Sequence, residues 1–256
     1  MSDSAGTASQ QPLEDLALTA EDRVLCVVAH PDDMEYGTSA AVARWTDEGI
    51  PVSYLLLTSG EAGIRDLAPE RTGPMRAEEQ RRACAEVGVE DLRILDFPDG
   101  MLEPTLALRR AIAATIRELR PTVVVTMGWA EEVAWGLNQA DHRAAGISVL
   151  DALRDADNPW VFRDLLDHPP EDLHLPAWHV GRLLVFGAEH PTHRLEITGE
   201  PLERSIRSLE AHRGYLEALP DHPEPRAMLE EFTRDDDATA RTSSPVHAVV
   251  FRVYPM

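Results

Sequence analysis

The chain has 256 residues with 24 basic and 45 acidic side chains, giving a formal net charge of −21, and its length suits one large domain. All of the basic residues are arginine, which excludes enzyme classes that need a lysine, such as Schiff-base enzymes, pyridoxal-phosphate enzymes and Walker-type nucleotide hydrolases. The acidic excess argues against nucleic acid and against an anionic membrane surface as partners.

Strand-like and helix-like segments alternate along the chain after a polar N-terminal arm. Residues 1–20 lack apolar periodicity, so we expect a disordered or loosely attached arm, followed by one domain over residues 21–256. Short β-branched runs predict strands at residues 23–29, 52–58, 93–96, 122–127 and 182–186. Amphipathic stretches predict helices at residues 37–48, 74–87, 104–119, 141–155 and 200–218.

This alternation predicts an α/β fold, a Rossmann-like and mainly parallel sheet with helices on both faces. Residues 246–254 are rich in β-branched side chains, and we expect them to add an edge strand. Binding sites in such sheets lie beyond the carboxyl ends of the strands. The first and fourth predicted strands should be neighbours where the strand order reverses, so the residues that follow them should meet.

Two cysteines, Cys26 and Cys84, fall in a predicted buried strand and a predicted helix. They have no CxxC spacing, so a thiolate metal site is excluded, and the N-terminus has no signal-peptide pattern. We therefore expect a reduced, cytoplasmic protein. No apolar stretch approaches the ~20 residues of a membrane helix, so we expect no membrane partner.

The first predicted strand ends in one imidazole and several carboxylates, where a nucleotide-binding protein would carry a glycine-rich turn. One aspartate could simply cap the next helix, but that leaves His30 and a second aspartate unexplained. A histidine and an aspartate three positions apart, here His30 and Asp33, can converge on one metal. Asp32, between them, would then face a bound water.

A second cluster follows the fourth predicted strand and contains Gln139, Asp141 and His142. We expect Asp141 to cap the helix that begins there, and His142 to meet His30 across the crevice. Two histidines and one carboxylate with an open fourth position form the ligand set of a catalytic zinc site. Fe²⁺ or another divalent ion could use the same set.

Five sequence motifs together resemble the LmbE/PIG-L family of zinc-dependent N-deacetylases. They are AHPDDMEYG (29–37), LLLTSGEAG (55–63), Arg76-x-x-Glu79, FPDG (97–100) and DHR (141–143), and the similarity covers essentially the whole chain after the arm.

The resemblance implies a single LmbE-like domain in which His30, Asp33 and His142 hold zinc and Asp32 is the general base. It implies that the enzyme removes an acyl group, expected to be acetyl, from an amide nitrogen of an amino sugar or related natural product. The partner is then a small N-acylated molecule, with a thiol conjugate as an alternative substrate and a homo-oligomer as a possible assembly.

One position departs from the family's pattern. Where much of the family has a histidine that helps to stabilise the oxyanion, this chain has Gln139, which donates a hydrogen bond but carries no positive charge. Three readings stay open: Gln139 is a neutral donor, His193 or His212 replaces the imidazole, or the protein binds metal with weak or no activity.

Substrate contacts are expected on the loops after the second and third predicted strands. Glu61, Arg65 and Asp99 lie there and could bind hydroxyls or a charge of the substrate. A solvated loop residue, or for Asp99 a turn former, is the alternative for each. Arg76 and Glu79, three apart on one predicted helix, could pair with each other.

Overall fold

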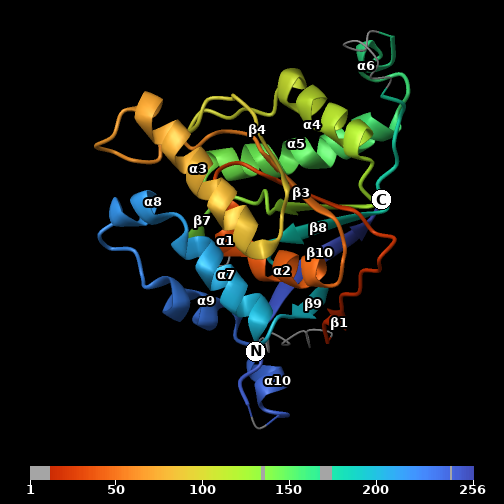
Figure 1. The fold of residues 1–256 in the computed structure, drawn as a ribbon. Coiled ribbons are helices and arrows are strands. Elements are labelled where there is room, and N and C mark those ends of the chain that lie inside the picture. Colours follow the sequence, from red (N-terminus) through yellow and green to blue (C-terminus); the bar gives the residue numbers. More distant parts are fainter. Residues whose placement is uncertain (1–11, 134–135, 168–174, 243) are drawn as a thin grey trace, which may run out of the picture.

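An eight-stranded sheet forms the centre of the molecule (Figure 1), in the strand order β1-β9-β10-β8-β5-β2-β3-β4. This structure, a computed structural model, describes residues 12–133, 136–167, 175–242 and 244–256. The strands of the sheet are β1 (Glu14–Asp15), β2 (Val24–Val28), β3 (Val52–Leu56), β4 (Asp91–Ile94), β5 (Val123–Met127), β8 (Arg182–Phe186), β9 (His193–Glu196) and β10 (Ala248–Pro255). Two short strands, β6 (Glu132–Val133) and β7 (Gly136–Leu137), pair separately.

Helices cover both faces of the sheet, which confirms the predicted α/β class (Figure 1). Helices α2, α3 and α7 pack together on one face, and α4 packs against α5 on the other (Figure 1). The helices are α1 (Asp33–Gly37), α2 (Ser39–Asp47), α3 (Pro69–Val87), α4 (Leu106–Leu119), α5 (Ala140–Asp157), α6 (Asp164–Asp167), α7 (Glu200–Glu210), α8 (Arg213–Glu217), α9 (Pro225–Thr233) and α10 (Asp236–Thr239).

The apolar residues of the central strands suit a parallel sheet that is buried on both faces. Every residue of β2 and β5 is buried, because a parallel sheet covered by helices on both faces needs apolar side chains on both sides of each strand. Strand β2 pairs in parallel with β3 and with β5. The predicted neighbourhood of the first and fourth strands is therefore confirmed, and the loops after them open at the same edge.

Two expectations about the ends of the chain need revision. Residues 248–255 form β10, which lies inside the sheet between β8 and β9 and runs antiparallel to both, so the predicted edge strand is wrong. Residues 1–11 of the expected arm lie outside the described residues. The following β1 pairs with β9 and Leu16 is buried, so residues 14–16 are attached to the domain.

Several helix boundaries differ from the predicted ones for local reasons. A short helix, α1, precedes most of the segment predicted at residues 37–48, and α2 begins only at Ser39, because Thr38 has non-helical dihedral angles between the two helices. The segment predicted at 200–218 divides into α7 and α8 at His212. Helix α3 begins at Pro69 rather than Pro74, because proline at the first helical position has the required φ and needs no amide hydrogen bond.

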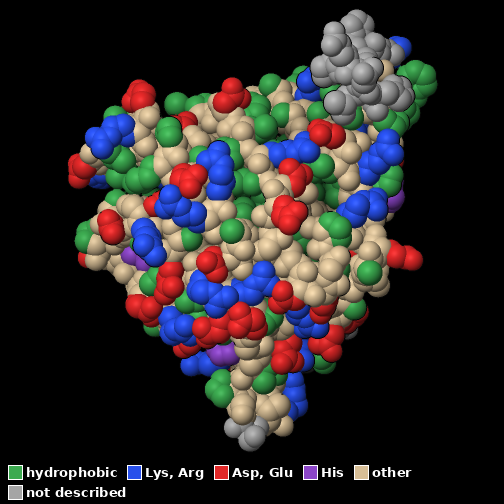
Figure 2. Space-filling view, viewed as in Figure 1, with side chains coloured by type: hydrophobic (Ala, Val, Ile, Leu, Met, Phe, Trp, Pro, Cys, Tyr) green, Lys and Arg blue, Asp and Glu red, His purple; other side chains and the backbone are tan. Residues whose placement is uncertain are grey.

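The surface carries both signs of charge. Figure 2 shows acidic and basic side chains interspersed on the face viewed there, so on that face the acidic excess is not gathered in one patch. None of the helices in the described ranges is long and apolar enough to cross a membrane.

Candidate active site

A pocket of about 260 Å³ lies where the loops after β2, β3, β4 and β5 meet, as expected for a parallel sheet. Its wall contains both histidines and both aspartates of the predicted metal and base set, together with side chains that the sequence did not single out for this site. The lining residues are His30, Asp32, Asp33, Tyr36, Ala62, Gly63, Arg76, Asp99, Gly100, Gln139, His142 and Tyr215.

The three expected metal ligands converge in this pocket. His30 lies in the loop after β2, Asp33 begins α1 and His142 lies in the first turn of α5. One donor atom of each lies within 4.8 Å of the other two. Asp33 is the link, because its Oδ1 lies 3.1 Å from His142 Nε2 and its Oδ2 lies 3.6 Å from His30 Nδ1. Two imidazoles and one carboxylate at this spacing fit a divalent cation.

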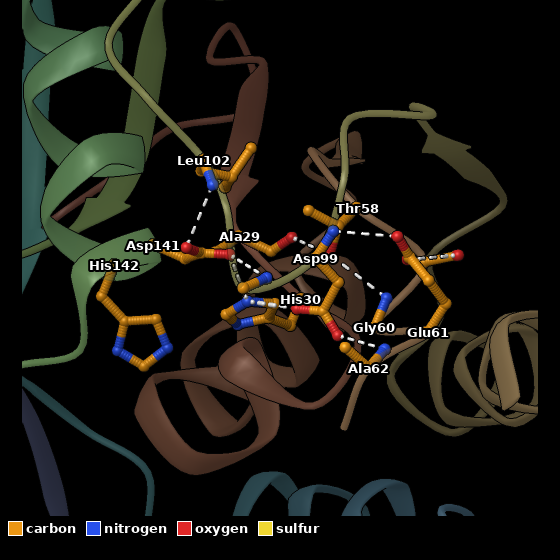
Figure 3. Close-up of polar contacts among 12 residues, drawn as sticks. Ala29, His30, Thr58, Gly60, Glu61, Ala62, Asp99, Leu102, Asp141 and His142 are labelled. Atoms are coloured by element: carbon orange, nitrogen blue, oxygen red, sulfur yellow. Dashed lines mark hydrogen bonds and ion pairs between the residues drawn. The ribbon is translucent and has the colours of Figure 1, made fainter. Parts of the chain in front are cut away.

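Carboxylates fix the orientation of His30 (Figure 3). Its Nε2 lies 3.0 Å from Asp99 Oδ1 and 3.3 Å from Asp141 Oδ2, so a proton on Nε2 leaves Nδ1 facing Asp33. Burial lowers the pKa of His30, but the charge of Asp33 and hydrogen bonds to Asp141, Asp33 and Asp99 outweigh burial and raise this pKa to about 12. The surroundings therefore favour positive charge, as a cation site requires.

His30, Asp99 and Asp141 form a second group of closely spaced donor atoms. Both carboxylates of this group already accept backbone hydrogen bonds: Asp99 from Ala62 N at 2.7 Å, and Asp141 from Gly100 N at 2.7 Å and Leu102 N at 3.1 Å (Figure 3). These two aspartates are therefore positioned to orient His30 from outside, an arrangement common around histidines that bind metals.

The expected helix-capping role of Asp141 is wrong. Helix α5 begins at Ala140 with Gln139 as its N-cap, which puts Asp141 inside the first turn, where its side chain bonds the loop after β4 instead of the helix. That loop is braced from the other side by Glu61, whose Oε1 accepts a hydrogen bond from Asp99 N at 2.8 Å and whose Oε2 accepts one from Ser59 Oγ at 2.9 Å.

The four residues expected to contact the substrate therefore lie in different places in the structure. Asp99 lines the pocket but lies behind His30, and Glu61 braces the loop. Arg65 is exposed on the loop after β3 and His193 lies in β9 beside Glu14, so neither belongs to the pocket wall in the part of the chain that the structure describes.

The three residues that could take the place of the family's oxyanion-stabilising histidine also lie in different places. Gln139 is exposed and lines the pocket. His212 is fully buried behind the wall, with its Nε2 3.7 Å from Glu35 Oε2. Gln139 is thus the only member of the Gln139, His193 and His212 set that reaches the pocket surface.

Asp32, the expected general base, is held in an unusual backbone conformation. Its φ of 84° is in the left-handed region, which costs a non-glycine residue on the order of 1 kcal/mol and is found preferentially at functional sites. Its backbone N donates to Gln80 Oε1 at 2.9 Å and its Oδ2 accepts from Arg76 Nη2 at 2.9 Å. Burial raises the pKa of Asp32 to about 6, although Arg76 acts to lower it.

The role of Arg76 is the clearest one that the sequence did not reveal, because its spacing from Glu79 suggested only a possible pairing between the two. Its guanidinium instead binds Asp32, donates to Pro31 O at 2.6 Å and to Gly60 O at 3.1 Å, and lies 4.0 Å from the centroid of the Tyr215 ring. A Cβ at Gly60 would collide with this guanidinium. The glycines of the run LLLTSGEAG were the available signal for a closely packed partner.

Comparisons with known proteins identify the family of this chain. Residues 25–153 match the family described as PIG-L: GlcNAc-PI de-N-acetylase. A probable N-acetyl-alpha-D-glucosaminyl L-malate deacetylase 2 of Bacillus cereus is 30% identical over 207 residues, which are 78% of this chain and 86% of that protein. Diacetylchitobiose deacetylase of Thermococcus kodakarensis is 35% identical over 140 residues, which are 54% of this chain and about half (51%) of that protein.

A solved structure supports the fold over a longer range. N,N'-diacetylchitobiose deacetylase from Pyrococcus horikoshii superposes with a TM-score of 0.76 at 20% identity, covering 91% of this chain and 84% of that one. The family match includes His30, Asp32, Asp33 and His142 and ends before Tyr215. From these matches and the similarity in fold, the chain belongs to the PIG-L family.

Proposed function

We propose that this protein is a divalent-metal-dependent hydrolase, with Zn²⁺ as the best fit, that removes an acetyl group from the amide nitrogen of an amino sugar or a related natural product. The observation that carries the proposal is the convergence of donor atoms from His30, Asp33 and His142, with the Asp32 carboxylate in the same pocket. Relatives named as deacetylases of N-acetylated sugars support the substrate class.

The metal would be held by His30, Asp33 and His142, and when bound it supplies a Lewis acid that acidifies water and polarises the amide carbonyl. Asp32 takes the proton from the attacking water and then passes it to the departing nitrogen, as a general base and acid. The hydrogen bonds of its side chain to the described residues engage Oδ2 only, so Oδ1 is left for water and substrate.

Two neighbouring side chains assist Asp32 and the carbonyl. Arg76 fixes the position of the Asp32 carboxylate through its bond to Oδ2. Gln139, at the pocket surface, donates its side-chain N–H to the carbonyl oxygen as negative charge develops there. A neutral amide donor stabilises this charge less than an imidazolium would, so the competing hypothesis is a family member that binds metal with little or no turnover.

The test combines metal analysis with acetate release from N-acetylglucosamine, N,N'-diacetylchitobiose and an N-acetylglucosaminyl malate. We expect one metal ion per chain and release of acetate from at least one of these amides. Full metal occupancy with no acetate from any N-acetylated amine would support the silent metal-binding protein and contradict the proposal.

Replacing the base separates chemistry from metal binding. Asp32→Asn should retain metal and lower kcat by roughly 10²–10⁴-fold, the usual contribution of a positioned general base; asparagine also tolerates the left-handed backbone. Asp151→Asn, a change in a half-exposed residue of α5, is the matched control and should leave kcat unchanged. Loss of metal from Asp32→Asn would mean that Asp32 and Asp33 have exchanged roles.

A further inference from the structure

Two tyrosines complete the pocket wall on the side of the base. Tyr36 comes from α1 and Tyr215 from α8, and both line the pocket together with Asp32 and Arg76. The chemistry proposed above uses neither of them. Tyr36 lies within the residues that match the family model, 25–153, whereas Tyr215 lies beyond them, so the wall joins a residue of the matched region to one from the C-terminal segment.

Tyr36 lines the pocket, but its hydroxyl is already engaged by a neighbouring residue. Its hydroxyl lies 2.7 Å from His222 Nε2, and His222 Nδ1 lies 2.5 Å from the carbonyl oxygen of Pro223. The carbonyl can only accept, so Nδ1 carries the proton, Nε2 accepts, and the Tyr36 hydroxyl donates to it. This bond uses the hydroxyl proton and fixes the ring in the wall.

Tyr215 is held by its ring rather than by its hydroxyl. Its ring lies under the Arg76 guanidinium, 4.0 Å from centroid to Cζ, and its hydroxyl has no hydrogen-bond partner among the residues that the structure describes. Burial raises the pKa of Tyr215, as does the charge of Asp32, so the hydroxyl keeps its proton and remains a donor. The ring is held and the hydroxyl is free.

Helix α8 is docked tightly enough to place this hydroxyl before a ligand binds. Gly214 N donates to Glu79 Oε1 at 2.5 Å, and a Cβ on Gly214 would lie 2.8 Å from Met75 Sδ, so the helix start sits directly on α3. His212, fully buried, precedes it. A binding group on such a support loses little freedom when it engages a ligand.

The position of the wall indicates which part of a substrate it meets. Under the proposed function, Asp32 must reach the departing nitrogen to protonate it, so the amine portion of the substrate lies beside Asp32. Arg76 bridges Asp32, at 2.9 Å, to the Tyr215 ring. Gln139 instead enters the pocket from the start of α5. The tyrosines thus adjoin the amine portion.

We propose that Tyr36 and Tyr215 form the subsite for the amine portion of the substrate and select a hydroxylated six-membered ring, that of an amino sugar. The Tyr36 ring packs against the apolar C–H face of the sugar, and the Tyr215 hydroxyl donates a hydrogen bond to a ring hydroxyl. These are specificity-determining contacts that leave acyl-group selection to other parts of the pocket. The inference rests on the proposed function.

Three amides separate these roles: N-acetylglucosamine, N-propionylglucosamine and N-acetylcyclohexylamine, whose ring has no hydroxyls. For Tyr215→Phe we expect KM to rise about fivefold to tenfold for both sugars, the value of one hydrogen bond, with kcat unchanged. N-acetylcyclohexylamine should be unaffected. Tyr36→Leu should raise KM for all three amides. Neither change should alter the preference for acetyl over propionyl.

The matched control is Tyr254→Phe, in β10 beside Trp129, which should behave as the wild type with every amide. Equal effects of Tyr215→Phe on the sugars and on the cyclohexyl amide, or a changed acetyl preference, would overturn the inference. So would wild-type kinetics for Tyr215→Phe.

A second readout needs no turnover. Glucosamine binding to the metal-loaded protein, followed by thermal shift, should weaken about fivefold to tenfold in Tyr215→Phe, while cyclohexylamine binding stays unchanged. If the wild type hydrolyses none of the amides, the proposed function fails, and this binding comparison still decides the subsite. Unchanged glucosamine binding in Tyr215→Phe would refute the subsite alone.

Discussion

Replacing Arg76 with methionine should destabilise the protein far more than removal of a surface arginine. Methionine keeps the length and apolar stem of the side chain and removes the charge. The change breaks the bonds to Asp32 Oδ2 (2.9 Å), Pro31 O (2.6 Å) and Gly60 O (3.1 Å), and the contact with the Tyr215 ring. Arg76 is 3% exposed and Asp32 is 5% exposed, so little water can reach them to replace the lost partners.

The expected magnitude follows from the burial of the pair. Removing one partner of a buried ion pair costs about 3–5 kcal/mol, because the remaining charge is left unpaired in a medium that solvates it poorly. For a chain of this size each kcal/mol lowers Tm by roughly 2–4 °C, so the expected fall in Tm is about 6–20 °C. Arg76→Lys keeps a charge but loses the planar fork that bonds several acceptors, so its cost should be intermediate.

Urea denaturation and calorimetry of metal-loaded wild type and variants measure the cost. The control is Arg93→Met, which removes a partly exposed arginine that pairs with Asp91 and Glu118 and should cost no more than about 1 kcal/mol. A loss of less than 1 kcal/mol in Arg76→Met, or one equal to that of Arg93→Met, would refute the claim that Arg76 is the buried counter-ion of the base.

Two further changes test the supports of the site, and a third tests the start of helix α10. Asp99→Asn, which weakens the contact that orients the proposed ligand His30, should reduce metal affinity 10–100-fold in a competition assay with a chelator; unchanged affinity would remove Asp99 from that role. Gly60→Ala should destabilise more than Gly49→Ala, since both have positive φ but only a Cβ at Gly60 meets Arg76; equal losses in urea would contradict this packing. Although burial raises the pKa of Asp235, hydrogen bonds from a backbone N–H and an arginine hold it below its ordinary value. Its stabilisation is thus present above the unfolded pKa of ~3.9 and lost as pH falls through the folded pKa. Asp235→Ala should therefore cost about 1 kcal/mol at pH 7 and less at pH 3, and equal costs at both pH values would show that the carboxylate charge is not what stabilises this helix start.

The convergence of the proposed metal ligands could be predicted from the sequence, because a rule of sheet topology relates the two strands that precede them. Alternating strands and helices predicted a parallel sheet, and the rule for neighbouring strands at the reversal of strand order brought the residues after β2 and β5 together. His30 and His142, 112 positions apart by their numbers, therefore could be paired before any coordinates were known.

Other features depended on placements that no local pattern encodes. The β-branched run of β10 has the same composition whether it lies at an edge or inside the sheet, so its position between β8 and β9 was not predictable. The expected N-cap, Asp141, lies two residues after the observed N-cap, Gln139, so its side chain bonds the loop after β4 instead of capping the helix. The Tyr36 and Tyr215 wall required the docking of α8 on α3, a long-range contact that periodicity does not reveal.

The position of the bound metal tests the central claim most directly. Anomalous X-ray diffraction at the zinc edge, from crystals of the zinc-loaded protein, locates the ion without reference to activity. We predict one strong peak among His30 Nδ1, Asp33 and His142 Nε2. A peak on the other side of the imidazole, between His30 Nε2 and the carboxylates of Asp99 and Asp141, or no peak near His30 at all, would contradict it.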